Sequence, residues 1–221
     1  MKTRMLTGSE MLLAHCLWGP GLYPALRKTR IIGERFSHDF IDELVDHWGF
    51  RQPESGQEPV DGAILTLVDA AAPITFIFCP EDAGPAVLMH EFGHAVHDAQ
   101  YPESKRWPVD KCEAFALLAD INAERWKTLD SHEHEAFARH RLAVQADPVY
   151  AAALARAEGL RGLALKDQMD AIANDRDASS YPPSPYSLPV GPATPVQLVA
   201  NTARADSLRR LGHWQWRPSG P

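Results

Sequence analysis

Three absences in the sequence narrow the classes of protein to which it can belong. None of its apolar runs approaches the roughly 18 residues that a membrane-spanning helix needs, which argues against an integral membrane protein. It has 22 lysine and arginine residues against 29 aspartate and glutamate residues, a net charge of −7. It therefore lacks the basic excess with which proteins bind a phosphate backbone. We expect neither a membrane nor a nucleic acid as partner.

Cysteine is also scarce. The chain of 221 residues has three, Cys16, Cys79 and Cys112, which lie far apart and form no CxxC pair. A sparse, odd set is typical of reducing compartments, where a free thiol acts as a small buried hydrophobe. The apolar stretch 11–18 contains a histidine, directly follows Glu10 and lacks a small-residue cleavage site, unlike an export signal. The sequence therefore predicts a cytoplasmic protein.

Proline and glycine divide the chain into the predicted elements of one domain, residues 1–221. Two short apolar segments bounded by turn residues, 63–68 and 74–79, predict a pair of strands. The helical spacing of apolar residues predicts helices over 37–48, 83–100, 109–128, 131–175 (two or three helices) and 196–211. The predicted fold class is α+β, a mostly helical domain with a small β-sheet preceding the helix at 83–100.

The most informative segment lies inside that helix. It reads His-Glu-Phe-Gly-His at 90–94 and matches the pattern HExxH. Residues four apart share one helix face, so the imidazoles of His90 and His94 can bind one metal ion. Glu91 lies beside them, where it can hold a water molecule and take its proton. This spacing is typical of zinc hydrolases with a zincin-like fold, and it predicts Zn²⁺ as cofactor with Glu91 as general base.

A zinc site of this kind needs a third protein ligand. Metzincins place a histidine six residues after the second one, but that position is Gln100 here. Gluzincins take a glutamate from the following helix, and Glu113 lies in the helix expected over 109–128. The prolines between the two helices allow the second to fold back against the first. We therefore expect His90, His94 and Glu113 to bind zinc.

Two further residues are expected around the metal. Asp120 shares a helix face with Glu113, where it would either accept the remaining N–H of His90 or His94 or form only a surface ion pair. His97 follows His94 by three residues and has three candidate roles: a spare ligand, a partner of a ligand, or a contact to the substrate. We expect a neighbour of the metal rather than a ligand, because Glu113 already completes the set.

Two segments of the chain resemble one known family. Met-His-Glu-Phe-Gly-His-Ala-Val-His at 89–97 is similar to the active-site helix of the thimet oligopeptidase and oligoendopeptidase F family, gluzincin metallopeptidases whose motif reads HEFGHAxH. Cys-Glu-Ala-Phe-Ala at 112–116 is similar to the helix that supplies their glutamate ligand. The resemblance implies zinc ligation by His90, His94 and Glu113, with Glu91 as the general base.

These features predict a zinc-dependent hydrolase, foremost a metallopeptidase that cleaves amide bonds in a peptide. The strand at 74–78 would then be a sheet edge along which an extended peptide could lie. Two alternatives stay open: an enzyme of the same fold that acts on a small non-peptide substrate, and a regulatory or structural zinc module. Glu91 argues against the module, because a structural zinc site has no use for a base.

The proline-rich stretch 178–195 interrupts the helical pattern. Its six prolines disfavour a helix or a central strand. It is either a linker wrapped over the surface or a lid over the zinc site. As a lid it would bring Tyr181 or Tyr186 to the substrate carbonyl, where a phenol can stabilise the oxyanion. His97 and Tyr101 are the other candidates for this donor.

Overall fold

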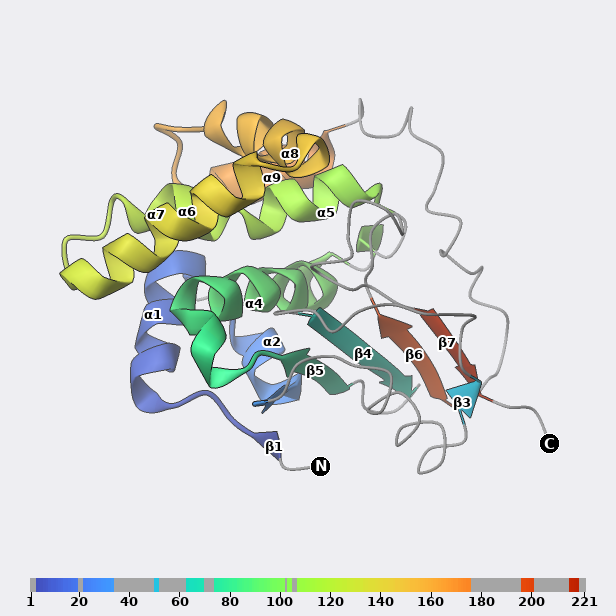
Figure 1. Ribbon diagram of the computed structural model, residues 1–221. Helices are drawn as coiled ribbons and strands as arrows, with labels where there is room; N and C mark the ends of the chain where they lie inside the picture. Colours follow the sequence, from blue (N-terminus) through green and yellow to red (C-terminus); the bar gives the residue numbers. More distant parts are fainter. Residues whose placement is uncertain are drawn as a thin grey trace.

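Figure 1 shows the computed structural model of the protein. The structure describes residues 3–19, 22–33, 50–51, 63–69, 74–101, 103–104, 107–175, 196–200 and 215–218. The helix predicted over 37–48 and the proline-rich stretch 178–195, with Tyr181 and Tyr186, lie outside the described residues. In the ranges described, no helix combines the length and the apolar character needed to span a bilayer.

The described chain is a mostly helical α+β structure. Its helices are α1 (Gly8–Trp18), α2 (Tyr23–Lys28), α4 (Gly84–Gln100), α5 (Val109–Ala116), α6 (Leu118–Ala123), α7 (Ser131–Gln145), α8 (Pro148–Glu158) and α9 (Leu165–Asn174). Its strands are β1 (Thr3–Arg4), β2 (Thr29–Ile32), β3 (Phe50–Arg51), β4 (Ala63–Asp69), β5 (Ile74–Phe78), β6 (Val196–Ala200) and β7 (Gln215–Pro218). The predicted fold class is confirmed at this level.

The strands form one sheet in the order β1-β2-β5-β4-β6-β7-β3. The predicted strand pair is confirmed, because β4 and β5 run antiparallel with Leu65 opposite Phe76. The predicted sheet edge at 74–78 is wrong. On its other side β5 pairs in parallel with β2, where Ile31 lies opposite Ile77. The backbone groups of β5 are therefore taken up by two neighbouring strands, and an extended peptide cannot add to this strand.

Helix α4 occupies the middle of the molecule. One side of it contacts β4 and β5, while α5, α6 and α7 pack on the other side and α1 and α2 flank it (Figure 1). The helix starts with Gly84 and Pro85 and ends at Tyr101, whose N–H donates to the carbonyl oxygen of His97. The helix predicted over 83–100 is thus confirmed. The turns from Leu88 to His97 are buried on every side.

Close packing of α1 fixes the position of α4. The indole N–H of Trp18 donates to the carbonyl oxygen of Met89 at 3.3 Å. Gly93 allows this approach, because a Cβ atom at that position would lie 2.6 Å from Trp18 Cζ2. The indole ring also stacks on Phe115 of α5, with ring centroids 5.8 Å apart. One tryptophan therefore sets the spacing between α4 and α5, the two helices that carry the motif residues.

Two predicted helices differ from the structure. The helix predicted over 109–128 is divided at Leu117 into α5 and α6 and ends at Ala123, where the backbone tightens to hydrogen bonds between residues three apart. The helix predicted over 196–211 is wrong at its start, because Val196–Ala200 is strand β6. Pairing with β4 decides this segment, since sheet contacts override a local helical pattern. The segment 131–175 holds three helices, as expected.

Candidate metal centre

The structure brings His90, His94 and Glu113 together. The two histidines project from α4 and the glutamate from α5, and each side chain is fully buried. His90 Nε2 lies 3.1 Å and His94 Nε2 lies 3.6 Å from Glu113 Oε2. Four ligands placed tetrahedrally about 2.0–2.1 Å from a zinc ion would be about 3.3 Å from one another. Two imidazoles and a carboxylate at these separations fit the ligand set and the size of a zinc site.

Electrostatics in this cluster keep Glu113 ionised. Burial alone would raise the pKa of its carboxyl group, but the neighbouring His94 and His90 outweigh burial and lower the pKa to about 2. Burial also lowers the pKa of His90, against the opposing influence of Glu113. An ionised carboxylate beside a histidine that favours its neutral form is the protonation state that a metal ion requires of its ligands.

Glu91 is a buried acid beside this triad. Its side chain is fully buried, and neither carboxylate oxygen has a hydrogen-bond partner among the residues that the structure describes. Burial, and then the negative charge of Glu113, raise its pKa well above the ordinary value. Such a carboxyl group is costly for stability, because nothing in the described surroundings compensates its polar atoms. It is available for a water molecule or a substrate.

His97 contacts the ring of His94 on the side away from the triad. Its Nε2 lies 3.1 Å from His94 Nδ1, the nitrogen of that ring that does not face Glu113. On its other side, His97 Nδ1 is 3.0 Å from Asp98 Oδ1, which also accepts the hydroxyl of Ser104. This series of contacts fixes the orientation of the His94 ring. His97 thus lies next to His94, and its role stays a prediction.

Asp120 is close to the triad, but its hydrogen bond goes elsewhere. We expected it to accept an N–H from His90 or His94, whereas its Oδ1 lies 2.7 Å from His140 Nδ1 on α7. The His140 ring is 5.2 Å from the His90 ring, centroid to centroid. Sequence reasoning missed His140. The signal was a histidine at helical spacing from the buried residues Phe137 and Val144, on the inward face of α7.

Tyr150, near the start of α8, is the second residue that the sequence did not reveal. It is 3% exposed, and its hydroxyl has no hydrogen-bond partner within the described part of the chain. Burial raises its pKa, and the charges of Glu113 and Glu91 raise it further, which places the phenol in the field of both acids. As a candidate donor to the oxyanion it replaces Tyr101, because the Tyr101 hydroxyl donates to Asp170 at 2.9 Å.

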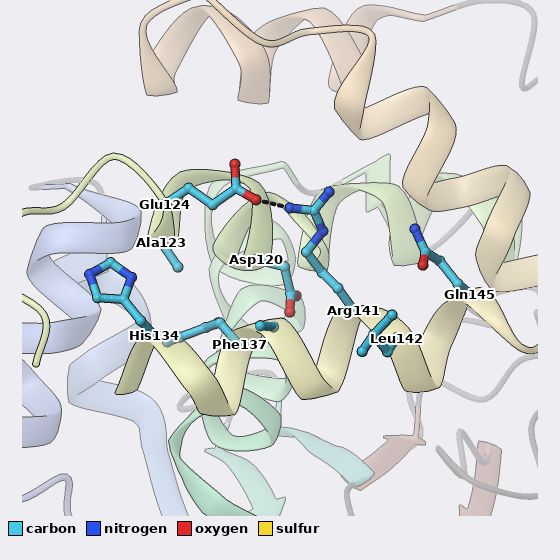
Figure 2. Close-up of a pocket in the computed structure, with 9 residues that line it drawn as sticks. Asp120, Ala123, Glu124, His134, Phe137, Arg141, Leu142 and Gln145 are labelled. Carbon is cyan, nitrogen blue, oxygen red and sulfur yellow. Dashed lines mark hydrogen bonds and ion pairs between the residues drawn. The ribbon is translucent and has the colours of Figure 1, made fainter. Parts of the chain in front are cut away.

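Two hollows lie next to the Asp120–His140 pair. One of about 300 Å³ lies between α6 and α7, with the Asp120 carboxylate directed toward α7 and Phe137 on the facing wall (Figure 2). The other, of about 540 Å³, lies over the first turn of α4 and includes His140 and Arg139 in its lining. The second is within the size range of small-molecule sites. His140 therefore connects an open pocket with the buried His90.

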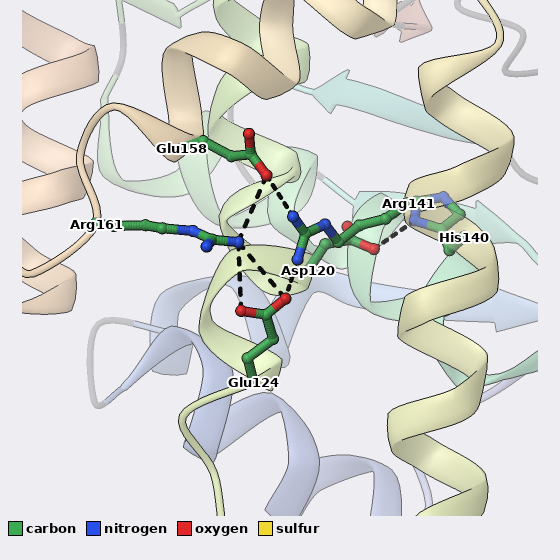
Figure 3. Close-up of polar contacts among 6 residues, drawn as sticks. All are labelled: Asp120, Glu124, His140, Arg141, Glu158 and Arg161. Atoms are coloured by element: carbon green, nitrogen blue, oxygen red, sulfur yellow. Dashed lines mark hydrogen bonds and ion pairs between the residues drawn. The ribbon is translucent and has the colours of Figure 1, made fainter.

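An ion-pair network holds the helix that carries His140. Arg141 pairs with Glu124, which follows α6, and with Glu158 at the end of α8, and Arg161 contacts the same two carboxylates at 3.3 and 3.4 Å (Figure 3). Arg141 is the more buried arginine of the two. The network ties α7 to its neighbours one residue after His140, and so it restricts where the imidazole can lie.

A comparison of the chain with family models, with curated proteins and with solved structures finds no match.

Proposed function

We propose that this protein is a zinc-dependent hydrolase with a zincin-like fold, in which His90, His94 and Glu113 bind the metal. The observation that supports it is the separation of three buried ligand atoms, 3.1 and 3.6 Å from Glu113 Oε2, on two adjacent helices. Zinc in such a site supplies Lewis-acid activation of water and of a substrate carbonyl group.

The remaining residues take the protein's part in the reaction. Glu91 accepts the proton of the attacking water and delivers it to the leaving group, a role for which its unpartnered carboxylate oxygens within the described site are free. Tyr150 donates its hydroxyl hydrogen to the developing oxyanion. Asp120 orients His140 through their 2.7 Å contact, so that the imidazole presents its other nitrogen. His97 orients the His94 ring.

We further propose a small amide-containing substrate rather than an extended polypeptide. Strand β5 is paired on both sides, which removes the sheet edge along which zincin peptidases would align a peptide. The presumed ligands are fully buried, and the hollow beside His140 is of about 540 Å³. A regulatory or structural zinc module is less favoured, because Glu91 would then be a buried acid without a use.

Metal analysis and hydrolysis assays test this proposal together. His94→Ala is expected to lose the zinc ion of this site, whereas Glu91→Gln should keep zinc and the folded structure but lose turnover about 10²–10⁴-fold. His15→Ala, an exposed histidine of α1, is the matched control for metal content. The substrates are a panel of chromogenic small amides and esters beside a labelled unfolded protein.

Each outcome separates the alternatives. Faster turnover of small amides supports the small-substrate enzyme, and faster cleavage of the labelled protein would overturn it in favour of a general peptidase. Zinc in the wild type without hydrolysis of any probe would favour the structural module. Undiminished turnover by Glu91→Gln would remove Glu91 from the mechanism.

A further inference from the structure

His90 belongs to a second group of potential ligands. Its ring, the Asp120 carboxylate on α6 and the His140 imidazole on α7 each place one ligand atom within 4.8 Å of the other two. Asp120 is fully buried, and the His140 side chain is 8% exposed. The three residues come from three different helices that pack together, so their convergence is a property of the fold rather than of one local motif.

Two atoms of this group have unmet hydrogen-bonding capacity. Asp120 Oδ1 accepts from His140, but Oδ2 is buried with no hydrogen-bond partner among the described residues. The same holds for Nδ1 of His90, whose Nε2 lies 3.1 Å from Glu113. Buried polar atoms without partners are costly and uncommon. A cation between them would satisfy both atoms at once.

The charge of the cluster points the same way. Glu113 and Asp120 are buried acids of the two groups that share His90, and buried Glu91 lies in the field of Glu113. One divalent cation at the first triad balances the charge of Glu113 and favours the ionised form of Glu91, which keeps its proton in the metal-free protein. Asp120 is paired with His140 alone, and a second cation at this pair would give its carboxylate a permanent counter-charge where burial makes a charge costly.

We propose that His90, Asp120 and His140 form a second cation site beside the first. It rests on the proposed function only through the shared His90. A neutral imidazole has one lone-pair nitrogen and one N–H, so binding of the second ion releases that proton to solvent and the ring bridges the two sites as an imidazolate. Two imidazole nitrogens and one carboxylate oxygen select a borderline divalent ion such as Zn²⁺ or Co²⁺ over Mg²⁺ or Ca²⁺, which prefer oxygen ligands. The hollow over the first turn of α4, lined in part by His140, gives an ion access to this site.

Titration of the chelator-treated full chain with Co²⁺ tests the proposal, with absorption spectra reporting binding and analysis of bound cobalt reporting stoichiometry. We expect two equivalents in the wild type, one in His140→Ala and one in His94→Ala. His90→Ala should weaken both sites, at least about 10-fold each. His15→Ala is the control and should keep two equivalents.

Asp120→Asn supplies a second variant that preserves side-chain shape, and circular dichroism checks that each variant is folded. It should retain one equivalent, as His140→Ala does. A wild type with a single equivalent that His140→Ala leaves unchanged would overturn the second site. If His94→Ala kept all its metal while His140→Ala lost one equivalent, the second site would stand and the metal set of the proposed hydrolase would fail.

Discussion

Replacement of Glu91 by glutamine should stabilise the metal-free protein in a manner that depends on pH. The carboxyl group is fully buried, and its pKa in the folded state is raised well above the ordinary value of 4.5, first by burial and then by the charge of Glu113. The folded chain therefore keeps a proton that the unfolded chain releases. The contribution to stability is complete below about pH 4.5 and is lost as pH rises toward the folded-state pKa.

The size of the effect follows from one proton. A difference of one bound proton changes the free energy of unfolding by about 1.4 kcal/mol per pH unit. The variant carries a neutral amide, so its stability does not fall with pH on account of this position. The other titrating groups are common to both proteins. Between pH 5.5 and pH 6.5, we expect the free energy of unfolding of Glu91→Gln to rise by about 1.4 kcal/mol relative to that of the wild type. For a chain of this length that is about 2–4 °C in Tm.

Urea and thermal denaturation between pH 4 and pH 8, in the presence of a chelator, measure the difference. Glu135→Gln, an exposed position on α7, is the matched control and should run parallel to the wild type at every pH. Parallel curves for Glu91→Gln and the wild type would show that Glu91 finds compensation when folded, and the argument from its burial would be refuted.

Two further substitutions probe the packing around α4 and α7. Gly93→Ala should lower the free energy of unfolding by about 1–3 kcal/mol, measured by urea denaturation, because the new methyl group would lie 2.6 Å from Trp18 Cζ2. Gly8→Ala is the control, because a Cβ atom there would have nothing within 4 Å. An equal effect of both substitutions would contradict this reasoning. Arg141→Ala should lower the free energy of unfolding by about 1–2 kcal/mol, and Arg161→Ala by less than about 1 kcal/mol. The difference is expected because the Arg141 side chain is 18% exposed and the Arg161 side chain is 46% exposed. Equal losses, or none in low salt, would show that the network does not hold α7.

The sequence was informative where structure is decided locally. Residues 84–100 form the predicted helix because a proline in its first turn, an apolar repeat and the HExxH spacing all agree. The strand pair β4–β5 has the same character, since both segments are short, apolar and bounded by turn residues. Helix α1 also begins at a local signal, the capping box formed by Thr7 and Glu10.

Other features are decided by contacts between distant segments. His140 and Tyr150 lie 50 and 60 residues after His90 in the sequence, and only the packing of α7 and α8 brings them toward it. Whether β5 is an edge strand or an internal strand likewise depends on β2. Strand β2 precedes β5 by more than forty residues, and the local pattern of β5 does not reveal it. Strand β6 belongs to the same class, because its partner β4 determines its conformation.

The burial of α4 on every side has a consequence for the dynamics of the protein. A helix on the surface can fray or detach while the rest of a domain stays folded, and its amide hydrogens then exchange through local opening. Helix α4 contacts the sheet on one side and α5, α6 and α7 on the other, so its amides become accessible only when these layers separate. The proposed zinc ligands His90 and His94 thus sit on the segment expected to exchange most slowly, whereas binding residues usually sit on the more mobile parts of a fold. Motions that expose His90 must therefore come from the helices packed against α4 rather than from α4 itself.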